Sequence, residues 1–131
     1  MALKVLRHDG TGELELSGTR SDLAAFGRAL HSGDGTVLLT EVPDPSPYSR
    51  SLSRIVVRRS DGEIVIDVPD NGEALRIEGE PEFLSLLARN IESFALEADS
   101  EGHLHVEFPG RDYLTEESDP MVVAIDSSRD S

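Results

Sequence analysis

The chain has 131 residues, no cysteine and a formal net charge of −14, since 12 lysine and arginine residues stand against 26 aspartate and glutamate residues. This length predicts a single domain over residues 1–131, and the lack of cysteine excludes disulfides and thiolate metal ligands. The negative charge disfavours nucleic acid and anionic membranes as partners and favours basic proteins. Because no long apolar segment is present, a cytoplasmic protein is expected.

The first elements predicted are a β-hairpin and an amphipathic helix. Residues 3–8 and 13–17 alternate apolar and polar side chains on either side of a glycine-containing turn, which is typical of two paired strands. Thr19 or Ser21 can cap the helix that follows. Apolar residues at helical spacing continue to Gly33, where we expect this helix to end.

The middle of the chain is predicted to be rich in strands. A short strand is expected over residues 36–41. The prolines of residues 42–50 predict a loop, because proline fixes φ and lacks an N–H. Residues 51–59 and 64–68 have the β-branched content of strands, and the Asp-Gly pair at 61–62 predicts that they form a second hairpin.

The last third is predicted to contain a strand at residues 74–78 and a helix from Pro81 through Phe94. Two further strands, residues 103–108 and 121–125, could pair with each other. Residues 126–131 are expected to form an acidic tail, and from residue 97 onward the chain carries a net charge of −8.

The two halves of the chain have similar patterns. A shift of 61 residues superposes their hairpins, glycines and helical stripes, so residues 1–41 and 62–108 could be an internal repeat of ββαβ units, although convergence on the same pattern explains the likeness equally well. Such halves predict an α+β fold: one largely antiparallel sheet of about seven to eight strands, with two helices packed on one face.

The segment between Gly102 and Gly110 concentrates titratable side chains. His103, His105 and Glu107 alternate with Leu104, Val106 and Phe108, so a strand would place the polar side chains on one face and the apolar ones toward the core. Three interpretations stay open for the polar row: a solvent-facing surface, a face that binds a partner, or a metal site. A metal would need further ligands from elsewhere in the chain.

Four arginines lie in the segment of residues 50–59. They could bind phosphate, but aromatic side chains are sparse there and the overall charge opposes nucleic acid, so we expect these arginines to pair with acidic residues across a sheet.

The segment from His103 to Gly110, followed by Tyr113, Leu114 and the apolar run Met121–Ile125, resembles the C-terminal signature of a bacterial immunity-protein family, immunity protein thirty-two. Residues 47–53 resemble the same family. The resemblance implies a protein of a polymorphic toxin system that binds and neutralises a cognate toxin, without catalysis or a cofactor of its own. The charge of −14 would suit a basic toxin such as a nuclease.

The leading hypothesis is therefore a cytoplasmic binding protein. It would contact its toxin through the predicted strand that carries His103 and His105, called the histidine strand below, and through the acidic segment after it. The residues assigned to this face are His103, His105, Glu107, Arg111, Asp112, Tyr113, Glu116 and Glu117. One alternative is a metal-binding protein or metal-dependent enzyme that uses His103, His105 and Glu107. The other is a small structural or regulatory domain with no site.

Overall fold

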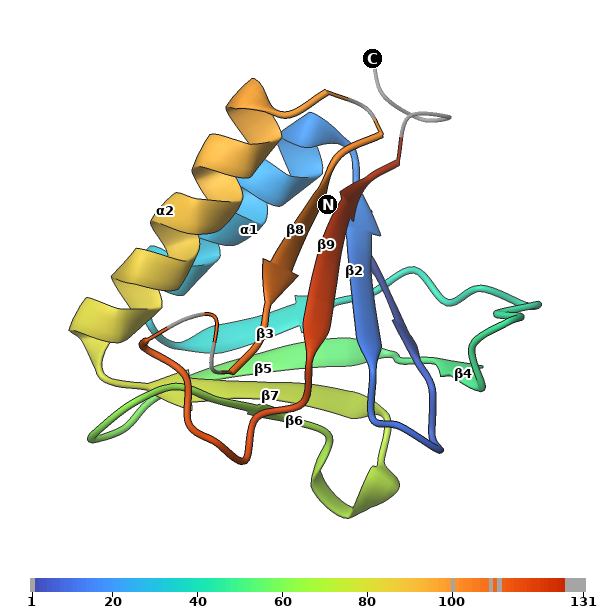
Figure 1. Cartoon of the computed structure of the whole chain (residues 1–131), viewed down its shortest axis with the longest axis horizontal. Helices are drawn as coiled ribbons and strands as arrows, with labels where there is room; N and C mark the ends of the chain where they lie inside the picture. Colours follow the sequence, from blue (N-terminus) through green and yellow to red (C-terminus); the bar gives the residue numbers. More distant parts are fainter. Residues whose placement is uncertain (1, 100, 109, 111, 127–131) are drawn as a thin grey trace.

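The computed structural model describes residues 2–99, 101–108, 110 and 112–126. In this part of the chain, two helices lie side by side and pack against two β-sheets whose strands run in different directions (Figure 1). Sheet A contains, in spatial order, β4 (Arg50–Ser51), β1 (Lys4–Arg7), β2 (Leu14–Gly18), β9 (Met121–Ile125) and β8 (His103–Val106). Sheet B contains β3 (Gly35–Leu38), β5 (Arg54–Arg59), β7 (Ala74–Gly79) and β6 (Val65–Asp67).

The helices are α1 (Arg20–Ser32) and α2 (Pro81–Glu97). Thr19 caps α1, because its Oγ1 accepts a hydrogen bond from the Asp22 N–H at 3.1 Å while its own N–H donates to Asp22 Oδ2 at 3.3 Å. The helix ends at Gly33, whose φ of 75° is left-handed and favours glycine. Neither helix is long and apolar enough to span a membrane.

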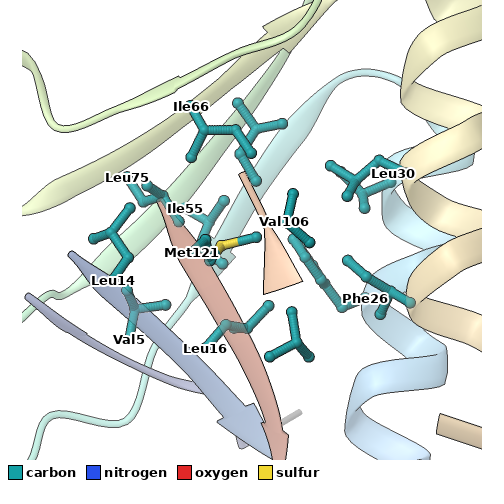
Figure 2. Close-up of a cluster of buried hydrophobic side chains, with 14 of the residues drawn as sticks. Val5, Leu14, Leu16, Phe26, Leu30, Ile55, Ile66, Leu75, Val106 and Met121 are labelled. Carbon is teal, nitrogen blue, oxygen red and sulfur yellow. The ribbon is translucent and has the colours of Figure 1, made fainter. Parts of the chain in front are cut away.

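The core lies between the inner faces of the two sheets and the apolar sides of the helices. Figure 2 shows Leu14 and Leu16 of sheet A, Ile55 and Leu75 of sheet B and Phe26 of α1 in one cluster of buried side chains. All five side chains are fully buried. The period-two pattern of the strands and the 3.6-residue stripe of α1 predicted these inward positions.

The structure confirms the α+β class and the two helices, but the prediction of a single sheet is wrong. After each helix the chain crosses to the other sheet, so β3 follows α1 into sheet B and β8 follows α2 into sheet A. The predicted hairpin between residues 51–59 and 64–68 is also wrong, because β7 lies between β5 and β6. Two pairings, β2 with β9 and β5 with β7, are parallel.

The strand registers of the two sheets correspond to each other. Val5 pairs with Leu16 in sheet A, and the residues 61 positions later, Ile66 and Ile77, pair in sheet B. The strands that arrive from the other half correspond too: β3 pairs with β5 as β8 pairs with β9, both antiparallel. Spatial order β1-β2-β9-β8 in sheet A thus matches β6-β7-β5-β3 in sheet B. The two sheets thus share strand order and register, and the internal repeat stays a prediction.

Candidate binding surface

The histidine strand is β8, which lies at one edge of sheet A (Figure 1). His103 and His105 are exposed, whereas Leu104 is half-buried and Val106 is fully buried. Side chains in these four residues alternate between solvent and core as the sequence predicts. The strand ends at Val106, so Phe108 lies beyond it and is 46% exposed rather than in the core as expected.

The two histidines share the outer face of sheet A with side chains from β9, β2 and β1. Register places His105 beside Val122 of β9, and Glu15 of β2 and Leu6 of β1 continue the same row. We define the outer face of sheet A by eight residues: Lys4, Leu6, Glu15, Ser17, His103, His105, Val122 and Ala124. Both helices pack on the opposite, inner side, where the core lies.

The proline-rich loop closes one border of the outer face of sheet A. The Tyr48 hydroxyl donates to Glu15 Oε2 at 3.2 Å and lies 3.4 Å from Glu13 Oε1. Burial, and then the two carboxylates, raise the pKa of Tyr48 to about 12. Lys4 forms an ion pair with Asp126 at 3.0 Å on the same face. The half-buried apolar side chains of this face therefore lie next to polar groups that are already held in place by these contacts.

The acidic segment after β8 is divided between two places. Glu107 and Asp112 are exposed close to β8 in the chain. Glu116 and Glu117 are also exposed, but their segment runs along β6 of sheet B, where Thr115 and Asp119 donate backbone hydrogen bonds to Ile64 and Ile66. The predicted site residues thus do not form a single cluster.

Tyr113 anchors this segment to the rest of the fold. It is only 7% exposed, and its hydroxyl donates to Asn90 Oδ1 of α2 at 2.5 Å. Its carbonyl accepts the Ile64 N–H at 2.7 Å. Tyr113 therefore holds the loop against α2 and β6, and its contact with a partner stays a prediction. Arg111, also assigned to the face, lies outside the described residues.

Sequence reasoning missed an apolar part of this region on α2. Leu86 is 37% exposed and lines a hollow together with Phe83, Asn90, Asp112 and Tyr113. Leu86 lies outside the stripe of α2 residues that face the core, so a large apolar residue at an outward helical position was the signal that could have identified it.

The geometry gives no support to the metal alternative. Among residues 2–99, 101–108, 110 and 112–126, no group of three or more histidine, aspartate or glutamate side chains is placed to hold a metal ion. Glu107, the third predicted ligand, follows the end of β8 and does not continue the histidine row as a strand residue.

The arginines of residues 50–59 pair less than the sequence predicts. Arg50 binds Asp9 Oδ1 through Nε at 2.9 Å and donates from Nη1 to the Gly72 carbonyl at 2.8 Å. Arg54, Arg58 and Arg59 are exposed, and none of them forms an ion pair with another residue that the structure describes. The expected cross-sheet pairing is therefore found only for the first of the four.

Comparison with known families gives one result. Residues 74–126 match the model of the Immunity protein 32 family, which confirms the resemblance inferred from the sequence. The matched segment contains β7, α2, β8 and β9, and therefore the histidine strand, the acidic segment and the strand beside them. The comparisons with curated proteins and with solved structures gave no match.

Proposed function

We propose that this chain, which matches the Immunity protein 32 family over residues 74–126, is an immunity protein that neutralises a cognate toxin by direct contact. The family match is the observation that carries this proposal. A binder of this kind needs no catalytic group, and its charge of −14 would speed its association with a basic toxin through long-range attraction.

The surface that we propose for the toxin is the outer face of sheet A. The strand register arranges this face in two rows. One row runs His105, Val122, Glu15 and Leu6, and the other runs His103, Ala124, Ser17 and Lys4, so half-buried apolar side chains alternate with polar ones and the two histidines lie at one border. A mixture of apolar and polar side chains is common in protein–protein interfaces that are not obligate, which as a whole are about as apolar as the rest of the protein surface. The ordered contacts of Tyr48 and Lys4 reduce the entropy that such a surface loses on binding.

The loop that follows β8 extends this surface toward α2. Phe108 and Leu86 supply exposed apolar side chains, and Glu107 and Asp112 supply negative charge close to them in the chain. A basic toxin would bring its own apolar side chains to Phe108 and its cationic side chains to the two carboxylates. In this proposal Glu116 and Glu117, which lie along sheet B, contribute to attraction at long range rather than to contact.

The test is binding of the purified full chain to the toxin encoded beside its gene, measured by calorimetry at low and high salt. We expect tight binding that weakens as salt rises, because salt screens charge attraction. The variant Val122→Arg places a bulky cation at the centre of the proposed surface. It should weaken binding about thirtyfold, the equivalent of losing one hot-spot residue worth about 2 kcal/mol.

Val56→Arg is the matched control. Val56 is half-buried on the outer face of sheet B, at the strand position that corresponds to Val122 in the other sheet. This control should leave the affinity for the toxin unchanged. No binding by the wild-type chain would refute the immunity function. Binding that is insensitive to Val122→Arg but lost in Val56→Arg would move the contact surface to sheet B.

A further inference from the structure

Among the described residues, the chain covers sheet B along its β6 edge, whereas at the other edge it reaches only a position beyond β3, where Thr40 donates to the Leu3 carbonyl at 2.8 Å. At β6, the segment of residues 113–119 supplies backbone hydrogen bonds to Ile64 and Ile66. At β3, Leu39 donates to the Ser53 carbonyl of the neighbouring strand segment, so in an antiparallel ladder Val37 and Gly35 also face β5. The backbone groups of Thr36 and Leu38 consequently point away from the sheet.

These outward backbone groups have no backbone partner in the part of the chain that the structure describes. Gly35–Leu38 contains no proline and no charged residue, and these are residues that commonly keep an edge strand from pairing with another chain. Leu38 is 74% exposed, and Thr36 is exposed beside it. An open edge that displays an apolar side chain can accept an additional strand from a partner.

Two arginines of β5 lie beside this edge, and the acids nearest to β3 in the chain are Asp34 before it and Glu41 after it. Arg54 is the register partner of Leu38, and Arg58 lies on the same outer face of β5. Neither arginine forms an ion pair with a described residue, whereas Arg76 on the next strand is held by Asp67 at 2.7 Å. Glu78 is the register partner of Arg58 on β7, but its carboxylate pairs with Arg76 at 3.9 Å. Arg54 and Arg58, which form no ion pair with a described residue, therefore leave local positive charge available to a ligand.

We infer that β3 is a docking edge for an extended acidic segment of a partner protein, which adds as a fifth strand to sheet B. Its backbone would pair with Thr36 and Leu38. On the outer face, its apolar side chains would pack against Leu38 and its carboxylates would reach Arg54 and Arg58. This site is separate from the outer face of sheet A, so it does not depend on the proposed contact with a toxin.

The experiment mixes the full chain with an eight-residue peptide of alternating glutamate and valine whose two ends are chemically blocked. Binding is measured by backbone NMR and by amide hydrogen exchange of the protein. The peptide should slow exchange of the Thr36 and Leu38 amides about tenfold at saturation, because it supplies the hydrogen bonds that they lack. The same peptide with lysine in place of glutamate should leave both exchange rates unchanged.

Charge variants separate this edge from a general attraction. The double variant Arg54→Ala, Arg58→Ala should bind the glutamate peptide about tenfold more weakly, since it loses two exposed charge pairs. Arg28→Ala with Arg89→Ala removes two exposed arginines from the helices and should change nothing. Equal binding of both peptides, or unchanged exchange at Thr36 and Leu38, would overturn the inference. So would dimerisation of the chain through β3, because a second copy would then be the occupant.

Discussion

Gly79 tests how tightly β7 packs against the start of β6. This residue ends β7 and faces Ile64, which precedes β6. A Cβ added at Gly79 would lie 2.8 Å from Ile64 Cγ1 and 3.0 Å from Ile64 Cα. The backbone there is fixed, because Ile64 donates its N–H to the Tyr113 carbonyl at 2.7 Å and its carbonyl accepts from Thr115 at 2.9 Å.

The variant Gly79→Ala should therefore lower the free energy of unfolding. Overpacking of this kind costs about 1–3 kcal/mol. Alanine also lowers the conformational entropy of the unfolded chain, which stabilises the folded state by about 0.4–1 kcal/mol, because the φ of Gly79 is one that alanine can adopt. The net loss is about 1–2 kcal/mol, which urea unfolding measures as a lower midpoint with an unchanged slope.

Gly18→Ala is the matched control, because Gly18 lies 61 residues earlier and ends β2. Its added Cβ would meet Leu3 Cδ2 at 2.7 Å, which is the end of a side chain, and Asp22 Cβ at 3.2 Å, whereas the backbone oxygen of Ala2 is 3.7 Å away. We expect a loss below about 1 kcal/mol. If Gly79→Ala is as stable as the wild type, or if Gly18→Ala loses as much, the argument from the fixed backbone of Ile64 is refuted.

Three further predictions concern polar contacts. Burial alone would raise the pKa of Asp22, but hydrogen bonds that its carboxylate accepts, among them one from the Thr19 N–H, lower this pKa from 3.8. Asp22→Asn should therefore cost about 1 kcal/mol at pH 7, and urea unfolding should show this difference shrinking below about pH 4. Because the pKa of Tyr48 is raised from 10.0 to about 12, the stability that its neutral form provides should be lost between those pH values, and Tyr48→Phe should remove this loss from alkaline unfolding curves. Tyr113→Phe should lower the thermal stability by about 1–2 kcal/mol through loss of the bond to Asn90, and an unchanged melting temperature would contradict the anchoring role.

Local elements could be predicted from the sequence because their signals are local. The capping residue Thr19, the terminating Gly33 and the proline at position 81 each fix a helix boundary through their own backbone chemistry. The hairpin of β1 and β2 is equally predictable, since these two strands are close in the chain and pair directly. Alternation in a strand, however, says which face is buried and not which strand lies beside it.

Because alternation does not specify which strands are neighbours, the sequence pattern wrongly predicted a single sheet. The Asp-Gly pair at residues 61–62 indicates a tight turn wherever the neighbouring strands are adjacent in space, but β7 takes the place beside β5 through a parallel ladder of six register pairs. Buried pairs such as Ile55 with Leu75 and Val57 with Ile77 decide this order. Such pairs join residues 20 positions apart in the chain, and no local pattern encodes them.

The candidate surface was predictable to the same extent. Alternation placed His103 and His105 outward and Val106 inward, but it carried no information on where β8 stops, so Phe108 was assigned to the core. Tyr113 lies in an irregular segment, where periodicity gives no sign of burial, and its contact with Asn90 depends on how the loop meets α2.

The crossing of the chain between the sheets has a consequence for how the molecule can be divided. Each hairpin and helix is completed by strands that the other half of the chain supplies, β8 and β9 for the first half and β3 and β5 for the second. A cut at residues 60–62 would produce two fragments that each carry the strands the other needs. Neither fragment could bury its hairpin alone, and the pair should regain the fold only by assembling together. One half expressed on its own could close its sheet only by exchanging strands with a second copy of itself.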